Sequence, residues 1–187
     1  SGLVGSEMCI RDRVHSEMPQ QEDGLLAGFQ LWVNLPASHK MVEPRYQEFD
    51  ASSIPREERE QGVLLRVVAG ETSRGTLGPV SELTTPVSYF DISLPAGSRF
   101  TEPLPEGYNA FVYLVEGEIG VGDQTVPPLS LAQLDQGEEL VIEAKQESRL
   151  LLVAGQPINE PIARRGPFVM NNDCLLYTSD AADDETS

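Results

Sequence analysis

Short apolar runs separated by glycine and proline dominate the middle of this chain. Residues 87–94 alternate apolar and polar side chains with a period of two, which places Phe90, Ile92 and Leu94 on one face of a strand. The 16 glycines and 14 prolines punctuate these runs at near-regular spacing. The pattern predicts an all-β sandwich or barrel. Seven further strands are predicted at residues 29–35, 63–68, 110–115, 118–121, 129–134, 139–144 and 149–154.

A predicted turn and the single tryptophan have specific predicted roles. Glu116 and Gly117 join two strands, and glycine can supply the positive φ that a tight turn needs. Trp32 is the only tryptophan and lies in an apolar run, so we expect it to pack in the core with a partner for its N–H group.

Residues 43–61 break the strand pattern. They contain Pro44 and Pro55, followed by the charge run Arg-Glu-Glu-Arg-Glu at 56–60. We interpret this region as an inter-domain linker that crosses the surface, with a short helical turn. The charge run is interpreted as a solvated face rather than a binding site.

The two ends of the chain differ in character from the rest. Residues 3–13 and 174–185 resemble translations of the adapter DNA used in transposon-based sequencing libraries. We therefore expect residues 1–13 and 174–187 not to be native, which leaves an authentic part from about Val14 to about Asp173. Both cysteines, Cys9 and Cys174, lie in these ends. The authentic part then offers neither a disulfide framework nor a thiol nucleophile.

The charge of the chain limits its partners. The formal net charge is −17, and removing the four acidic residues of 174–187 leaves −13. An acidic surface repels phosphate backbones, so we expect no nucleic-acid partner. No apolar run reaches the ~18 residues that a membrane span needs, so we expect no membrane partner. With no export signal visible, the simplest location is cytoplasmic.

His15 and Glu17 are the first candidate metal ligands. In a strand, residues two apart point to the same face, so an imidazole and a carboxylate could reach one metal. This pair suits iron, manganese or zinc. The spacing alone is a weak signal, and an exposed polar strand end would look the same. The other histidine, His39, has no visible partner and is expected to be a solvated loop residue.

Four segments of the chain carry family-like motifs: VHSEMP at 14–19, GFQLWVNLPASHKMVEPRYQEF at 28–49, the stretch 94–122, and the closing segment 151–171. These motifs resemble those of the pirin family, whose members contain two cupin barrels. The family fold is a double-stranded β-helix, or jelly-roll barrel. The resemblance implies that residues 14–42 end the N-terminal cupin domain, that 43–61 form the linker, and that 62–173 form the C-terminal cupin domain.

The resemblance also implies a metal site. The N-terminal barrel of a pirin holds one metal, usually iron, through an H-x-H segment followed by a histidine and a glutamate. His15 and Glu17 match the last two ligands, whereas the H-x-H segment is absent here. In the second barrel, Phe100, Thr101 and Glu102 stand where a metal-binding cupin would need histidines, so we expect no metal there. Glu102 is interpreted as a turn or rim carboxylate, as are Glu116 and Glu118, and Arg164 and Arg165 as salt-bridge partners.

By resemblance, the full-length protein is an iron-dependent, quercetin-type dioxygenase that uses Fe(2+) or another divalent metal. The alternative is a non-enzymatic, redox-responsive regulatory protein that binds transcription factors or metabolic enzymes. The expected partner is accordingly a flavonol-like small molecule or another protein. The chain itself is expected to be inactive, since two ligands leave a metal site open and weak.

Overall fold

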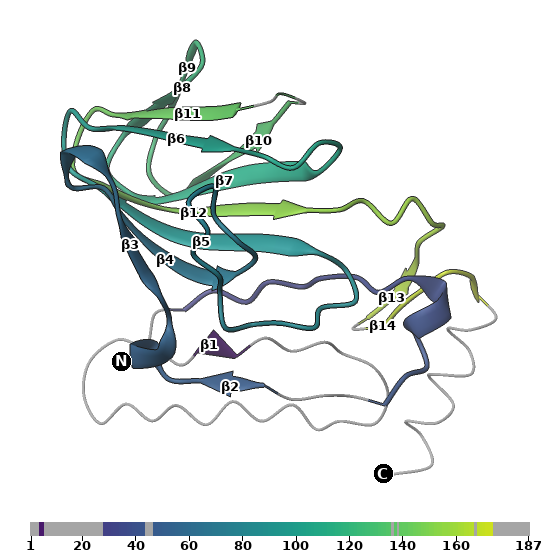
Figure 1. Ribbon diagram of the computed structural model, residues 1–187. Helices are drawn as coiled ribbons and strands as arrows, with labels where there is room; N and C mark the ends of the chain where they lie inside the picture. Colours follow the sequence, from purple (N-terminus) through teal and green to yellow (C-terminus); the bar gives the residue numbers. More distant parts are fainter. Residues whose placement is uncertain are drawn as a thin grey trace. The chain divides into compact units, whose positions relative to one another are not determined.

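The computed structural model describes residues 4–5, 28–43, 47–135, 137, 139–166 and 168–173 (Figure 1). The chain divides into two compact units. One is Phe49–Pro157, called here the sandwich unit. The other combines Gly2–Glu48 with Ile158–Ser187 and is called the second unit. Within the described residues, no helix is long and apolar enough to cross a membrane.

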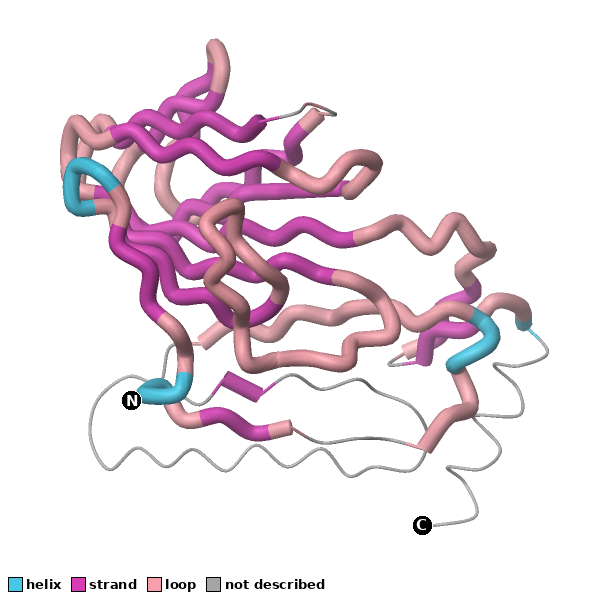
Figure 2. Tube along the Cα trace, in the orientation of Figure 1, coloured by secondary structure: helices cyan, strands magenta, loops and turns pink. Residues whose placement is uncertain are grey.

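The sandwich unit consists of two antiparallel sheets that form two layers (Figures 1 and 2). The larger sheet has six strands in the order β10-β7-β12-β5-β4-β3, and the smaller has four in the order β6-β11-β8-β9. The strands of the larger sheet are β3 (Arg56–Glu58), β4 (Leu64–Ala69), β5 (Val87–Leu94), β7 (Asn109–Glu116), β10 (Ser130–Leu134) and β12 (Ser148–Gly155). Those of the smaller sheet are β6 (Arg99–Pro103), β8 (Ile119–Val121), β9 (Gln124–Val126) and β11 (Glu139–Ala144). Short 3-10 helices are η1 (Ala37–His39), η2 (Ala51–Ser53) and η3 (Glu60–Gly62).

The core lies between the two sheets. Alternation along β5 buries Phe90, Ile92 and Leu94, as the period of two predicts. Leu152 of β12 and Ile142 of β11 are fully buried in the same cluster. Burying each such side chain contributes about 1.5–3 kcal/mol, so this layer supplies most of the stability of the sandwich unit.

The strand predictions are confirmed inside the sandwich unit. Strands β5 and β11 have the predicted bounds, and β4, β7, β8, β10 and β12 lie within one or two residues of theirs. The prediction for residues 29–35 is wrong, since no strand forms there. Instead, the side-chain oxygen of Asn34 accepts hydrogen bonds from the Leu35 N–H group and from Lys40. Local side-chain bonds of this kind compete with the ladder of a sheet.

Gly117 marks the point where the chain leaves one sheet for the other. Strand β7 ends in the six-stranded sheet at Glu116, and β8 begins in the four-stranded sheet at Ile119. Gly117 has φ +88°, and a Cβ atom there would lie 2.2 Å from the Ser148 hydroxyl oxygen. Glycine is therefore required by backbone conformation and by space.

The second unit contains a hairpin formed by β13 (Ala163–Arg165) and β14 (Phe168–Met170). Glu160 accepts hydrogen bonds from the backbone N–H of Ala37 at 2.6 Å and from Asn171 Nδ2 at 2.9 Å. Burial lowers the pKa of Lys40, and the nearby negative charge of Glu160 partly offsets this. Segments far apart in the sequence are thus held together by a shared carboxylate. The remaining strands of the described residues, β1 (Val4–Gly5) and β2 (Glu48–Phe49), form a short pair.

Trp32 is not a core residue, contrary to the sequence prediction. Its side chain is 49% exposed, and the Arg164 guanidinium lies over the indole ring, 5.9 Å from its centroid. Arg164, predicted to be a salt-bridge partner, thus makes a cation–π contact. We expect the tryptophan emission to be that of a partly solvated indole, quenched by acrylamide less efficiently than N-acetyltryptophanamide but far more than a buried tryptophan would be. A blue-shifted, poorly quenched emission would contradict this placement.

Candidate functional site

The predicted metal ligands His15 and Glu17 lie outside the described residues. His39 is exposed on η1, with its Nδ1 atom 2.8 Å from the Ser38 hydroxyl, in agreement with a solvated loop histidine. In the part of the chain that the structure describes, no three His, Cys, Asp or Glu side chains are grouped to hold a metal ion. The buried polar side chains of the sandwich unit are therefore the next candidates for a functional site.

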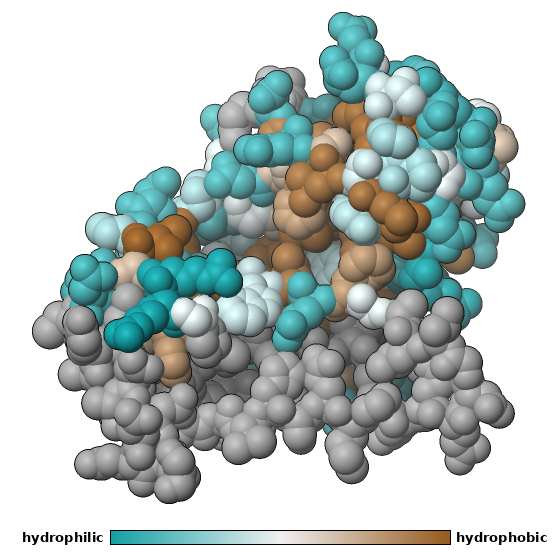
Figure 3. Space-filling view, turned by 180° about the vertical axis from the view of Figure 1, so that it is seen from behind, coloured by the Kyte–Doolittle hydropathy of each residue, from teal (hydrophilic) through white to brown (hydrophobic). Residues whose placement is uncertain are grey.

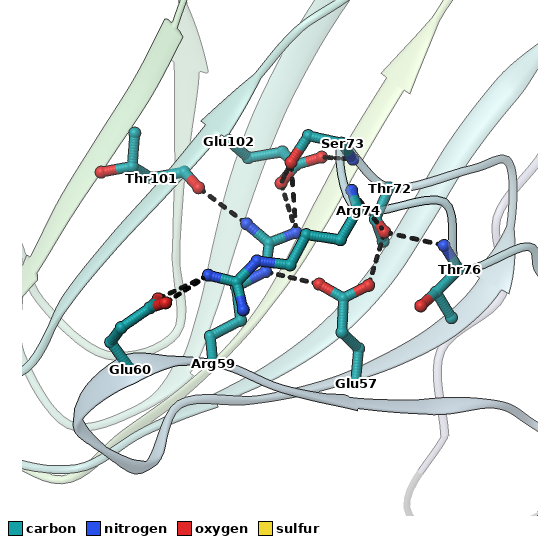
Figure 4. Close-up of polar contacts among 9 residues, drawn as sticks. All are labelled: Glu57, Arg59, Glu60, Thr72, Ser73, Arg74, Thr76, Thr101 and Glu102. Carbon is teal, nitrogen blue, oxygen red and sulfur yellow. Dashed lines mark hydrogen bonds and ion pairs between the residues drawn. The ribbon is translucent and has the colours of Figure 1, made fainter.

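The most extensive buried polar group lies in the sandwich unit and centres on Arg59 (Figure 4). Its Nε atom is 2.5 Å from Glu57, and its Nη2 atom is 2.6 Å from Glu102. The Nη1 atom donates to the backbone oxygen of Thr101 at 2.9 Å. The guanidinium also lies 5.4 Å from the ring centroid of Phe100. We call Glu57, Arg59, Thr72, Ser73 and Glu102 the Arg59 cluster.

Strand geometry explains why two residues of the charge run turn inward. In β3, Glu57 is buried whereas its neighbours Arg56 and Glu58 are exposed. Arg59 lies two residues further along, on the same side, and its side chain is only 7% exposed. The interpretation of residues 56–60 as a solvated face is therefore wrong for Glu57 and Arg59. Glu57 and Arg59 are two residues apart, and this spacing was the sequence signal that could have placed both side chains on the inward face.

Glu102 is also buried, so its interpretation as a turn or rim carboxylate is wrong. The alternation of β6 turns Phe100 and Glu102 toward the interior, and Glu102 is 2% exposed. One carboxylate oxygen accepts the Ser73 backbone N–H at 2.7 Å. The other accepts the Ser73 hydroxyl at 2.9 Å and pairs with Arg59. Charge-assisted bonds of this kind are short and strong.

The same contacts show that this carboxylate does not suit a metal ion. A cation beside Glu102 would meet the fixed positive charge of Arg59 at close range, and like charges repel strongly where water is scarce. Glu102 already has the counter-ion that a buried carboxylate requires.

Glu57 is held in its charged form by hydrogen bonds. Burial raises the pKa of its carboxyl group, but hydrogen bonds from Thr72, Thr76 and Arg59 outweigh this effect, so the pKa is lowered. The Thr72 hydroxyl donates to Glu57 at 2.5 Å. The neighbouring pair Arg74 and Glu60 is more exposed, with Arg74 donating to both carboxylate oxygens at 2.6 Å. Exposed pairs of this kind stabilise a fold only slightly.

An open hollow of about 280 Å³ lies beside the Arg59 cluster. Thr72, Ser73 and Glu102 belong to both, while Phe90 and Leu104 give the hollow much of its apolar lining. We call this feature the hollow. Apolar side chains also reach the surface elsewhere, among them Leu129 and Leu131, and Figure 3 shows such areas among polar ones. The hollow is lined by Glu71, Thr72, Ser73, Ser88, Phe90, Glu102, Pro103, Leu104 and Pro105.

Comparison with known proteins explains this architecture. Residues 89–176 match the pirin C-terminal cupin domain. A pirin-like protein of Caulobacter vibrioides is 48% identical over 158 residues, which cover 84% of this chain and 57% of that protein. The chain belongs to the pirin family. A human pirin is 38% identical over 169 residues, covering 86% of this chain and 56% of that protein.

Relatives within the pirin family include proteins named as enzymes. A putative quercetin 2,3-dioxygenase of Pseudomonas aeruginosa is 40% identical over 165 residues, covering 85% of this chain and 58% of that protein. The crystal structure of a quercetin 2,3-dioxygenase from Acinetobacter baumannii is similar with a TM-score of 0.76 and 33% identity, over 82% of this chain and 54% of that one. The chain thus spans a little over half the length of the pirins it matches.

The match also confirms the predicted fold class. The sandwich unit is an all-β cupin fold, as the sequence predicted. The predicted domain boundaries at 42/43 and 61/62 stay predictions. The six-stranded sheet nevertheless already begins at Arg56, inside the region interpreted as a linker.

Proposed function

We propose that the full-length protein carrying this chain is a metal-dependent dioxygenase of the quercetin 2,3-dioxygenase type. The likeness to the Acinetobacter baumannii quercetin 2,3-dioxygenase, at 33% identity with a TM-score of 0.76, carries the proposal. The substrate class would be a flavonol, a planar molecule with a hydroxyl and a carbonyl oxygen side by side.

His15 and Glu17 would provide two of the ligands for a divalent metal, with Fe(2+) as the specific proposal. The metal would supply Lewis-acid chemistry, holding and polarising the two neighbouring oxygens of the substrate. His15 would bind through a neutral imidazole nitrogen, which requires its other ring nitrogen to carry the proton. Glu17 would take up the proton that the flavonol hydroxyl loses on binding. Two further histidines, in an H-x-H segment upstream of Val14, would complete the site.

The sandwich unit would have a supporting role in this function. Its buried carboxylates, Glu57 and Glu102, are committed to Arg59, which leaves no described acidic group of the Arg59 cluster for metal chemistry. A rigid, ion-paired fold of this kind is suited to holding a partner domain in place rather than to catalysis.

A regulatory role is the second candidate. The formal net charge of −17 would favour a basic protein partner, because complementary charge speeds association and selects partners. In that case the oxidation state of the metal would change the affinity for the partner without turnover of any small molecule.

The decisive experiment is to sequence the gene upstream of Val14 and assay the full-length protein for oxygen uptake with quercetin. We expect an upstream H-x-H segment, metal-dependent uptake, and a loss of at least ~100-fold in activity and metal content for His15→Ala and Glu17→Gln. His39→Ala is the matched control and should behave as the wild type. Activity that survives removal of the metal, or variants that retain full metal content, would rule out this function.

A further inference from the structure

We propose that the hollow of the sandwich unit binds a small neutral molecule that has one apolar ring and one hydroxyl group, and that the Ser88 hydroxyl holds this ligand by a hydrogen bond. The hollow is formed only by residues 71–105. The site is therefore separate from the proposed metal site and does not depend on His15 or Glu17.

Ser88 is a buried polar residue whose hydroxyl has no hydrogen-bond partner among the described residues. It alternates along β5 with Phe90 and Ile92, so its side chain points between the two sheets, and it lines the hollow while only 8% exposed. Within the described part of the chain, Asn171 Oδ1 is the only fully enclosed side-chain nitrogen or oxygen without a partner, so the Ser88 oxygen keeps contact with solvent. A buried hydroxyl in this condition gains from any ligand that supplies the missing hydrogen bond.

The other polar side chains beside the hollow are already used within the protein. The Thr72 and Ser73 hydroxyls donate to carboxylates of the Arg59 cluster, at 2.5 Å and 2.9 Å. Both carboxylate oxygens of Glu102 are held inside the same cluster and accept nothing from a ligand. Among the described buried residues that line the hollow, Ser88 thus retains the free hydrogen-bonding capacity, which matches a ligand with a single polar group.

The charges near the hollow exclude an ionised ligand. An ammonium group would lose water against apolar side chains and near Arg59, with no buried carboxylate oxygen open to receive it. A carboxylate would be repelled by Glu71, which is exposed at the hollow, and by Glu102. A neutral molecule has neither cost.

The apolar lining and the volume set the rest of the ligand. Pro103, Leu104 and Pro105 are exposed or half-buried and present apolar surface to a ring. Phe90 is only 2% exposed, so it contributes little contact area. The volume of about 280 Å³ falls just below the ~300–1,000 Å³ in which drug-sized molecules bind. One ring fits this space, whereas a molecule with several rings, such as a flavonol, is too large.

The test titrates the full 187-residue chain with phenol and with fluorobenzene in the presence of EDTA, and follows the amide resonances by NMR. The two molecules have nearly the same shape, but only phenol carries a hydroxyl group. We expect phenol to bind with a dissociation constant near ~1 mM, the range for so small a molecule, and to shift the resonances of Ser88, Leu104 and their neighbours. Fluorobenzene should bind about 5-fold more weakly, which is the effect of one hydrogen bond. Benzylamine and benzoate should both bind more weakly than phenol.

Ser88→Ala tests the role of the hydroxyl directly. This variant should bind phenol about 5-fold more weakly than the wild type and fluorobenzene no more weakly, so the preference for phenol disappears. Ser93→Ala is the matched control, because Ser93 lies on the same strand, is exposed, and does not line the hollow. It should leave both affinities unchanged. Leu104→Trp should fill the hollow and abolish the binding of both molecules.

Several results would overturn the proposal. One is a preference for phenol that persists in folded Ser88→Ala, and another is tighter binding of benzylamine or benzoate than of phenol. Resonance shifts elsewhere in the chain, unchanged binding to folded Leu104→Trp, or no binding of phenol at about 20 mM would overturn it as well.

Discussion

Replacing Arg59 with alanine is expected to destabilise the sandwich unit by about 3–5 kcal/mol, because the change leaves buried charges without a counter-ion. Glu57 and Glu102 are both more than nine-tenths buried, and Arg59 is the cation that contacts each of them. The measurement is urea unfolding followed by far-ultraviolet circular dichroism. Trp32 fluorescence is unsuitable, because that residue belongs to the second unit.

The stability lost in Arg59→Ala should depend on pH. In the wild type the pKa of Glu57 is lowered, so its stabilising contribution is present above the unfolded pKa of about 4.3 and is lost as the pH falls through the lower folded pKa. In Arg59→Ala, Glu57 loses the hydrogen bond and the positive charge of Arg59, so its pKa should lie higher than in the wild type. The variant then has less of this stabilisation to lose in acid. The difference in stability between wild type and variant should therefore narrow as the pH falls below about 4.3.

Arg66→Ala provides the matched control. Arg66 lies on β4, its side chain is 47% exposed, and its distance from Asp91 is 3.8 Å. Removing so exposed a partner should cost about 1 kcal/mol or less, with no narrowing at low pH. If Arg59→Ala were as mild as Arg66→Ala, the Arg59 cluster would not be a buried ion-pair network.

The substitution Gly117→Ala is expected to cost about 3 kcal/mol or more. A positive φ costs a residue with a side chain roughly 1–2 kcal/mol, and crowding of a packed site adds about 1–3 kcal/mol. Both apply here, since φ is +88° and the new Cβ atom would lie 2.3 Å from the Glu147 backbone oxygen and 2.2 Å from the Ser148 hydroxyl. The measurement is again urea unfolding of the sandwich unit.

Gly97→Ala separates the two effects. Gly97 has a similar φ of +77°, and no atom lies within 4 Å of the Cβ position. This variant should therefore lose only the conformational part, about 1–2 kcal/mol. Equal losses for Gly97→Ala and Gly117→Ala would mean that the contact with Ser148 relaxes without cost.

The sequence predicted the strands that alternate or carry long apolar runs, because burial on one face fixes both their period and their register. Val87–Leu94 is the clearest case. Prediction of a strand from an apolar run failed for residues 29–35, where Trp32 and Phe29 are apolar yet about half exposed. An apolar run predicts burial only if another surface is available to cover it, and that information is not local.

The Arg59 cluster was missed for a related reason. Charged side chains are almost never fully buried unless they are paired, so a charge run is normally interpreted as exposed. The partner of Arg59 is Glu102, 43 residues further along, and only the fold brings the two strands together. The metal ligands His15 and Glu17 rest on the family resemblance, and they remain a prediction because they lie outside the described residues.

The position of β12 in the larger sheet has a consequence for biosynthesis. This strand lies between β5 and β7, pairing Leu94 with Ser148 and Val87 with Gly155. Pairings between residues so distant in sequence slow folding, because a long loop must close before any contact is gained. During translation, β5 and β7 must therefore wait with unpaired edges until Gly155 has left the ribosome. Their unpaired backbone N–H and C=O groups can pair with other chains, so this interval is when the nascent chain is most open to aggregation.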